Sequence, residues 1–425
     1  MPESDSVVAA KPSTEGPATP DVLLAIATRD AGTGIAATVQ AAHSAAQRLN
    51  ASVALFLADF ASRDDTPALM RQAVGDTMPL RQAAFPADGG AGAGAVPTTI
   101  ASRPEALRAA LDAARHMNVR ALVVIDPARA SGSDSWSVPL TEPVLAGRAD
   151  LVVPLYARQR FAGGLNSGVA YPLTRALYGK QVRQSLVQEF ACSAATVNLL
   201  LASAWPPELA RFGAESWLLA SVLCSPMRVA QAHVAGALAP VGSASEPLSQ
   251  VVARVVGAMF TESGRQAAVW QRVRGSKPVE TSGVPASPEA ESGTLAADAA
   301  AALDAFRLAQ RNLAEVWGLI MPPQTLLELR RLTLRPADDL RFPDLLWARV
   351  VYDFMLAHRT RVMNRDHLAA AFTPLYLGWF GSLVGEVAQA TPDVVDERIE
   401  KLCLRFEEQK PYVIGRWRSP DRFNP

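Results

Sequence analysis

The first half of the chain alternates short apolar runs with longer stretches of helical periodicity. Uninterrupted apolar runs of five to seven residues are typical of strands buried on both faces of a sheet. Strands that alternate with helices predict right-handed crossovers and a mainly parallel sheet. We therefore expect an α/β fold with helices on both faces of the sheet. The predicted strands are residues 22–27, 52–58, 120–125 and 150–156, and helical stretches include residues 35–49 and 105–117.

Acidic side chains follow two of these predicted strands. Asp59 comes directly after the second strand and Asp126 directly after the third. Ligands on parallel sheets bind beyond the carboxyl ends of the strands, so these positions are candidates for a binding site. Asp59 could contact a base or ribose there, or it could cap a turn as strand-end aspartates often do. The residues alone leave both interpretations open.

After about residue 245 predicted strands almost vanish, and apolar residues recur at helical spacing. Such periodicity predicts amphipathic helices, so the last third is expected to be a helical unit. The helical positions are Leu303, Phe306, Leu313, Val316 and Ile320, then Leu346, Val350, Phe354 and Met355, then Ile399, Leu402, Cys403 and Phe406. The expected organisation is a disordered tail at 1–20, an α/β domain at 21–245, and a helical region at 246–425 with a linker around 275–293.

Charge and cysteine content narrow the class of protein. The 425 residues contain 41 Lys and Arg against 41 Asp and Glu, which gives no electrostatic reason to expect nucleic acid or an anionic membrane as partner. The three cysteines are far apart, which argues against a disulfide framework and fits a reducing compartment. The sequence has no secretory signal at its start and no run of about 18 uncharged apolar residues. We expect a cytoplasmic protein without a membrane span.

One segment carries a family resemblance. Residues 171–184, YPLTRALYGKQVRQ, resemble the acceptor region of glucosylglycerate synthase-like glycosyltransferases, relatives of the mannosylglycerate synthases. Shorter matches extend this resemblance over roughly residues 120–417, and they lie at residues 149–156, 211–217, 342–344, 351–354, 364–367, 373–378 and 410–412. The resemblance implies the GT-A plan of nucleotide-sugar transferases and a helical C-terminal region. It also implies transfer of a glucosyl or mannosyl group from a nucleotide sugar to a small hydroxy acid such as glycerate.

The resemblance gives four residues a role in binding the acceptor. Thr174 and Arg175 stand where the family holds the glycerate carboxylate and hydroxyls, and Arg183 and Gln184 where it contacts phosphate or sugar. Arg has the best-shaped side chain for a carboxylate. From the residues alone, Thr174 could equally be a helix N-cap and Arg175 a surface arginine, and Arg183 and Gln184 could form a solvated helix end.

Two acids match the family's acidic residues beside the sugar. Glu189 and Glu215 are therefore the candidate catalytic residues, able to hold sugar hydroxyls and steady a cationic transition state. A lone Glu is more often a solvated surface residue. Residues 185–188 read Ser-Leu-Val-Gln where the family has glycines, so bulk is added next to the predicted donor site.

The residues expected to bind the nucleotide sugar, which is the sugar donor, differ from those of the family. The family uses a divalent cation, Mg or Mn, held by an Asp-x-Asp and a histidine, but this chain reads Asp126-Pro127-Ala128 and has Ala239 at the histidine position. His233 nearby falls inside a predicted strand and is expected to pack there. We therefore expect that this chain lacks the side chains that hold the divalent cation in the family. An arginine could replace the cation as a phosphate clamp, with Arg129 preferred and Arg63 and Arg103 as alternatives, beside Asp59 and Asp126 in a nucleotide-sugar site.

Three functional hypotheses follow. The first is a hexosyltransferase that works without a bound metal. The second is a catalytically inactive relative that serves as a partner or regulatory subunit, as a homo-oligomer or with an active homologue. The third is a different α/β nucleotide-binding enzyme. The sequence contains no Gly-x-Ser-x-Gly elbow, His-Glu-x-x-His or Walker loop that would point to other chemistry.

Overall fold

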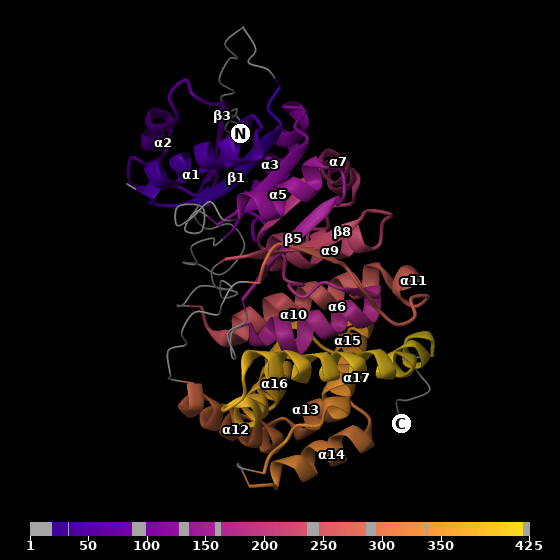
Figure 1. The fold of residues 1–425 in the computed structure, drawn as a ribbon. Coiled ribbons are helices and arrows are strands. Elements are labelled where there is room, and N and C mark those ends of the chain that lie inside the picture. The colour runs from indigo at the N-terminus through magenta and orange to yellow at the C-terminus, as the bar shows by residue number, and fades with distance from the viewer. Residues whose placement is uncertain are drawn as a thin grey trace, which may run out of the picture.

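An eight-stranded sheet forms one half of the computed structural model (Figure 1). The structure describes residues 19–32, 34–86, 99–126, 136–157, 163–235, 246–285, 295–336 and 339–419. The strand order is β10-β8-β5-β7-β4-β1-β2-β3. The strands are β1 (Val22–Thr28), β2 (Val53–Asp59), β3 (Leu80–Ala84), β4 (Ala121–Ile125), β5 (Leu151–Tyr156), β7 (Phe190–Ser193), β8 (Val229–Val234) and β10 (Glu280–Ser282).

All neighbouring strands of this sheet are parallel except β7. That strand runs antiparallel to both β4 and β5, between which it lies. The four strands predicted from apolar runs are confirmed as β1, β2, β4 and β5. The predicted linker around 275–293 contains β9 (Lys277–Pro278), which pairs with β6 (Lys180–Gln181), and it also contains the edge strand β10. Residues 1–18 of the predicted tail and residues 286–294 lie outside the described part.

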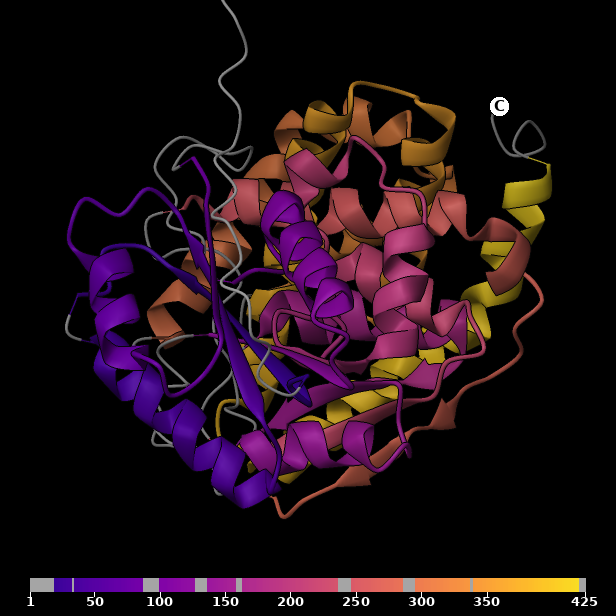
Figure 2. The same ribbon diagram turned by 90° about the horizontal axis from the view of Figure 1, so that it is seen from above.

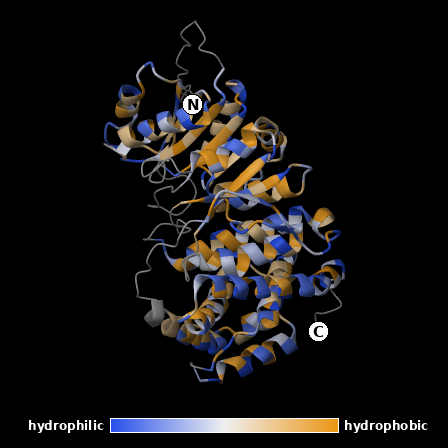
Figure 3. Cartoon of the chain, in the orientation of Figure 1, coloured by the Kyte–Doolittle hydropathy of each residue, from blue (hydrophilic) through white to orange (hydrophobic). Residues whose placement is uncertain are grey.

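Helices cover both faces of the sheet, as the sequence predicted. The central strands β1, β2 and β4 are buried along their whole length, which explains why their sequences are continuously apolar. Alternate residues of these strands join two separate cores, one under each layer of helices. One layer contains α1 (Gly34–Leu49), α2 (Thr66–Val74) and α5 (Ser137–Leu145), and the other contains α3 (Pro104–His116), α7 (Ala194–Ala202) and α9 (Glu215–Leu223). Figure 3 shows the apolar colouring of the strands between these layers.

The second half of the described chain is helical, as expected. Its elements are α10 (Leu248–Arg265), α11 (Ala267–Trp270), α12 (Leu295–Asn312), α13 (Ala314–Gly318), α14 (Pro323–Thr333), α15 (Asp344–Thr360), α16 (Arg365–Val387) and α17 (Pro392–Arg418). The π-helix η1 (Asn166–Ala170) and α6 (Tyr171–Tyr178) belong to the same core although they precede the predicted boundary at residue 245. Figure 1 shows α6 and α10 next to the sheet and α12, α13 and α14 farthest from it, with α17 between these two groups. Figure 2 shows the sheet and the helical region from above.

Helix α16 is the one helix in the described part that is long and apolar enough to cross a membrane by length and composition. However, 72% of its most apolar 18-residue window is buried inside the structure. Buried core helices of globular proteins meet the same criterion, so this helix gives little support for a membrane span.

Tryptophans join α15, α16 and η1 at the centre of the helical core. The rings of Trp347 and Trp379 are stacked, with centroids 5.5 Å apart and planes 14° apart. Trp347 Nε1 donates a 2.7 Å hydrogen bond to the carbonyl oxygen of Gly168. A Cβ atom at Gly168 would lie 2.1 Å from the ring of Trp379, so only glycine allows this close approach.

Replacing this glycine therefore tests the packing. We expect Gly168→Ala to lower the free energy of unfolding by about 1–3 kcal/mol, because the fully buried Trp379 ring must move. Gly264→Ala is the control: this exposed α10 glycine has no atom within 4 Å of an added Cβ. The control should be neutral or stabilising by about 0.5–1 kcal/mol. Urea unfolding measures both, and equal stability of the two variants would contradict the packing described.

Candidate active site

The carboxyl edge of the sheet gathers several of the predicted site residues. Asp59 ends β2, and Asp126 follows β4. Because β7 runs antiparallel to its neighbours, the residue before its first position, Glu189, also lies at this edge. A residue far along the chain thus comes next to Asp126.

Glu189 is held between three strands. Its Oε1 atom accepts a 2.9 Å hydrogen bond from the backbone N–H of Asp126, and its Oε2 atom accepts one from the hydroxyl of Tyr156 at the end of β5. The residue is 4% exposed, so the interpretation as a solvated surface glutamate is wrong. A carboxylate fixed in this way has one orientation toward anything bound at the edge. It can accept hydrogen bonds from hydroxyls or stabilise positive charge.

Tyr156 was not among the predicted site residues. Its position as the last residue of a predicted strand was the available signal, since strand ends are where ligands bind on such sheets. Two more polar groups at this edge are buried without a hydrogen-bond partner in the described structure: Thr28 Oγ1 at the end of β1 and Trp136 Nε1 before α5. Buried polar atoms are nearly always paired in native proteins, so unpaired ones at one edge point to a bound polar molecule or water.

Asp59 caps a turn. Its carboxylate accepts hydrogen bonds from the hydroxyl of Ser62 and, at 3.3 Å, from the backbone N–H of Ser62. Ser62 Oγ in turn accepts from the backbone N–H of Asp30, which joins the loops after β1 and β2. Of the two interpretations from sequence, these contacts favour the turn cap; contact with a base or ribose stays a prediction.

Glu215 starts α9. This helix leads into β8, which is parallel to β5, so the first turn of α9 lies toward the carboxyl edge. Glu215 is 6% exposed, and burial raises the pKa of its carboxyl to about 7, although Arg254 opposes the shift. Gly213 before it has φ +80°, and a Cβ there would lie 2.2 Å from Glu215 Oε2. A carboxyl group that is half protonated near pH 7 can donate or accept a proton.

The predicted acceptor arginines are both in ion pairs with α17. Arg175 donates from Nε to Glu407 at 2.6 Å and from Nη1 to Glu400. Arg183 donates from Nη1 to Glu400 at 2.5 Å and from Nη2 to Asp396. These contacts join the segment around α6 to the last helix. A glycerate carboxylate would have to compete with three protein carboxylates, so the acceptor role of both arginines stays a prediction.

The sequence alone also allowed a helix N-cap at Thr174, a surface arginine at Arg175 and a solvated helix end at Arg183 and Gln184. The structure excludes these three roles. Arg175 is 5% exposed and is not a surface arginine, and Thr174 lies inside α6 rather than at an N-cap. Gln184 is buried too, and its Nε2 donates to the carbonyl oxygen of Leu186 at 3.2 Å, so Arg183 and Gln184 do not form a solvated helix end. Thr174 lines a small pocket together with Tyr178, Ser185, Ser216 and Glu262.

Arg103 already has protein partners for its guanidinium group. It is 3% exposed, donates to Glu105 and to the carbonyl oxygen of Pro86 at 2.9 Å each, and stacks 4.7 Å above the ring of Phe60. Arg63 is exposed. Arg129, the preferred phosphate clamp, lies outside the described residues, as does Ala239.

The described residues do not fit a divalent cation. No group of three or more His, Cys, Asp and Glu side chains among them could hold a metal ion. His233 lies inside β8, as predicted, and is half-buried. Residues 127–135 and 236–245, which follow β4 and β8 in the chain, lie outside the part that the structure describes. The expectation that the metal site is lost therefore stays a prediction.

Comparison with protein-family models and with curated proteins finds no match. Among solved structures, glucosyl-3-phosphoglycerate synthase from Mycobacterium tuberculosis in complex with UDP is similar, with 21% identity and a TM-score of 0.41 over 58% of this chain and 80% of that one. A complex of the same enzyme with Mn²⁺, UDP and glucosyl-3-phosphoglycerate has 21% identity, a TM-score of 0.40 and the same coverage. A structure described only as a mycobacterial protein has 21% identity and a TM-score of 0.41, over 58% and 74% of the two chains. At TM-scores below one half, this likeness carries no argument about fold or function.

The raised pKa of Glu215 makes stability depend on pH. A carboxyl whose pKa is higher in the folded state than in the unfolded state loses stability as pH rises from about 4.5 to about 7. Glu215→Gln removes this dependence, so its stability relative to wild type should improve by about 2–3 kcal/mol between pH 5 and pH 8. Chemical unfolding at both pH values measures the difference. Glu408→Gln, at a half-exposed position on α17, should have nearly the same stability relative to wild type at both pH values. If the stability of Glu215→Gln relative to wild type were also the same at both pH values, the raised pKa of Glu215 would be contradicted.

The ion pairs of Arg175 give a second prediction. Arg175→Met removes one of the two arginines paired with Glu400 and the arginine paired with Glu407. We expect a loss of about 2–3 kcal/mol in the free energy of unfolding, because the guanidinium of Arg175 is buried while its partners are partly exposed. Arg115→Gln breaks an exposed pair with Asp112 and should cost less than about 1 kcal/mol. A stable Arg175→Met protein would favour the acceptor role instead.

Proposed function

We propose that this protein is a hexosyltransferase that moves a sugar from a nucleotide sugar to a small hydroxy acid of the glycerate type. Two observations support this proposal. The residues that resemble glucosylglycerate synthase-like transferases extend over roughly 120–417, and the fold is a mainly parallel sheet with a helical C-terminal region. The observation that carries the proposal is the fixed carboxylate of Glu189 beside Asp126 and Tyr156 at the carboxyl edge.

Glu189 suits the sugar side of this reaction. In hexosyl transfer the bond from the anomeric carbon to the diphosphate oxygen breaks, and a bond from that carbon to the acceptor oxygen forms. Positive charge develops on the sugar ring between these events. A carboxylate whose two oxygens are already oriented by Asp126 N–H and Tyr156 can hold sugar hydroxyls and stabilise this charge without reorganising.

Proton transfer needs a second group. The acceptor hydroxyl must lose its proton as it attacks, and the pKa of about 7 at Glu215 matches that task near neutral pH. We assign Glu215 this function because it lies toward the same edge of the sheet. The unpaired Thr28 and Trp136 groups would then contact the nucleotide sugar.

The charge of the diphosphate leaving group needs a positive partner. A divalent cation such as Mg²⁺ or Mn²⁺ would supply that charge. The described residues do not fit such an ion, so we assign no step to it. Arg129 is the alternative that the sequence offers.

The proposal predicts transfer that depends on Glu189. Incubation with UDP- or GDP-glucose and D-glycerate should give a glycosylated product, and Glu189→Gln should lower kcat by about 100-fold or more, because the charge that meets the transition state is removed. Tyr156→Phe should lower kcat by about tenfold, because Glu189 loses the hydrogen bond that Tyr156 donates. Glu408→Gln should retain full activity. Mass spectrometry of the product measures each variant.

Controls separate the remaining alternatives. Activity that survives EDTA and is lost in Arg129→Ala would support an arginine in place of the cation, whereas EDTA-sensitive activity would show that a metal is used. Absence of nucleotide-sugar binding in the folded protein would contradict the proposal and favour an inactive partner subunit.

A further inference from the structure

Exposed cationic side chains gather where the end of α6, the segment that follows α11 and the last turn of α17 meet. The backbone N–H of Lys277 donates a 3.0 Å hydrogen bond to the carbonyl oxygen of Gly179, next to Lys180. The ring centroids of Trp270 and Trp417 lie 5.1 Å apart, and Figure 1 shows α11 and the end of α17 on the same side of the molecule. We use the term basic surface for the exposed cations of these three segments: Lys180, Arg272, Arg274, Lys277 and Arg418.

The basic surface has no carboxylate of its own. No Asp or Glu occurs in residues 176–188, 266–279 or 409–420, the three stretches that supply it. Arg274 donates to the carbonyl oxygens of Gln271 and Val273, and Arg418 donates to the side-chain oxygen of Gln271. In the part of the chain that the structure describes, none of the five cations pairs with a carboxylate.

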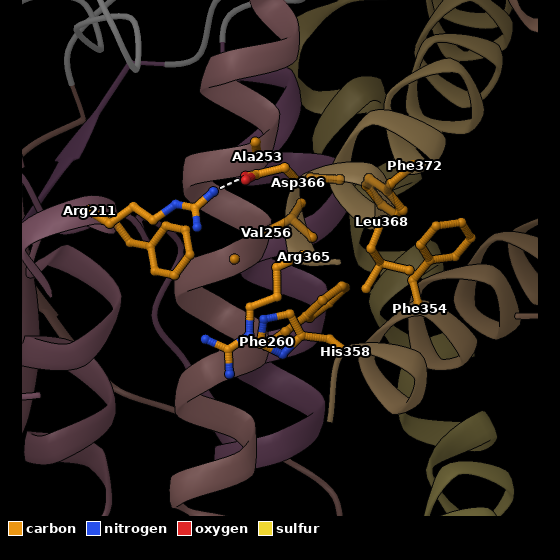
Figure 4. A pocket seen from close by; sticks show the side chains of 13 residues that line it. Arg211, Ala253, Val256, Phe260, Phe354, His358, Arg365, Asp366, Leu368 and Phe372 are labelled. Atoms are coloured by element: carbon orange, nitrogen blue, oxygen red, sulfur yellow. Dashed lines mark ion pairs between the residues drawn. The ribbon is translucent and has the colours of Figure 1, made fainter. Parts of the chain in front are cut away.

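Two exposed arginines elsewhere show the contrast. Arg211 of α8 (Leu209–Phe212) pairs with Asp366 at the start of α16, beside a small and largely apolar pocket (Figure 4). Arg405 pairs with Glu408 at 2.6 Å on α17. At the basic surface, by comparison, the fold leaves the positive charge uncompensated.

Two of the lysines face each other across a strand pair. Lys180 of β6 and Lys277 of β9 are partners in a parallel ladder, so both side chains project from the same face of the pair. Like charges directly opposite each other destabilise paired strands. An anion that binds between the two lysines would relieve this repulsion.

A further cation lies beneath the basic surface. Lys410 is 5% exposed, and its Nζ atom donates to the carbonyl oxygens of Leu177 and Val273 at 3.2 and 2.9 Å. The pKa of Lys410 is lowered to about 8, mainly by burial and further by Arg274, while Glu407 opposes the shift. A negative charge bound at Arg274 would offset its repulsion of Lys410 as well.

The limited extent of the basic surface favours a short anionic segment. Along the chain it is bounded by carboxylates: Glu280 follows Lys277, and Glu407 and Glu408 precede Lys410. A long nucleic acid or an anionic membrane would extend beyond it, over a molecule whose charges balance overall.

The side chains around the basic surface also argue against bases and lipid. Proteins that bind single strands stack bases on exposed aromatic rings, but Trp270 and Trp417 are buried. Helices that lie on a membrane insert Trp, Phe or Leu side chains, and α11 exposes none of these. Carboxylates of a protein need only the cations themselves.

We propose that the basic surface docks a short acidic segment of a partner protein, in which several Asp or Glu side chains lie close together. Its carboxylates pair with the arginines and bind between the facing lysines. Ser276, which precedes Lys277, accepts a hydrogen bond from Arg175 Nε and donates one to Glu407. The docked segment therefore lies beside the contacts that join α6 to α17. This docking does not depend on the proposed transferase activity.

Binding of dye-labelled octaglutamate to the full chain tests the proposal. Fluorescence anisotropy at pH 7 and low salt should show saturable binding, which weakens toward physiological salt because exposed charges are screened. Arg272→Gln combined with Arg274→Gln should weaken binding about fivefold or more. The matched control combines Arg330→Gln with Arg331→Gln, two exposed arginines of α14, and should bind as wild type does.

A second variant separates docking from folding. Lys180→Gln combined with Lys277→Gln removes the repulsion between the strands, so the free protein should be at least as stable to urea as wild type. The same variant should bind octaglutamate about fivefold or more weakly.

Other outcomes would overturn the proposal. These are no binding of octaglutamate to folded wild type, equal affinity of wild type and the Arg272 and Arg274 double variant, and an equal loss in the α14 control. Tighter binding of octathymidylate than of octaglutamate would indicate a nucleic acid instead. Sedimentation of the protein with phosphatidylserine vesicles would indicate a membrane instead.

Discussion

The proposed site depends on the hydrogen bonds of one carboxylate, that of Glu189. In a purely parallel sheet, only the last residues of strands reach the carboxyl edge. The reversed strand β7 breaks that rule, because the residue that precedes it is the one that reaches the edge. Glu189 is consequently placed against the backbone of Asp126 and the hydroxyl of Tyr156, from the two strands that flank β7. Without the reversal, its carboxylate would lie at the opposite edge, away from both partners.

A second set of charges fixes the helical region to the sheet. Arg175 and Arg183 lie near the segment that leads to Glu189, and their carboxylate partners come from α17, more than 200 residues later. Lys410 of α17 adds hydrogen bonds to the carbonyl oxygens of Leu177 and Val273 at 3.2 and 2.9 Å. Buried charges are retained only when they are paired, so each cation here depends on α17 staying in place. The C-terminal helix thus supports the segment on which the proposed site is built.

Much of the fold could be predicted from the sequence, because its signals are local. Continuous apolar runs indicated β1, β2, β4 and β5, and helical spacing indicated the helices of the last third. The short strand β7 has only four residues, and β10 lies in a stretch rich in proline, serine and glycine, so neither shows a pattern of its own. Both are set by the strands beside them, which sequence periodicity does not reveal.

Only part of the site could be predicted from the sequence, because the contacts between its residues depend on the fold. Asp126 and Glu189 could be identified from a strand end and a family resemblance, but their contact depends on the reversed strand. Tyr156 looked like the end of an apolar run. The partners of Arg175 and Arg183 could not be inferred, because the resemblance suggested a ligand where the fold supplies glutamates from a distant helix.

A crystal structure with a bound nucleotide sugar would test the central claim most directly. The account predicts the sugar ring at the carboxyl edge, with its hydroxyls on Glu189 and Tyr156 still bonded to that carboxylate. A nucleotide sugar bound elsewhere, with Glu189 covered only by protein, would contradict it.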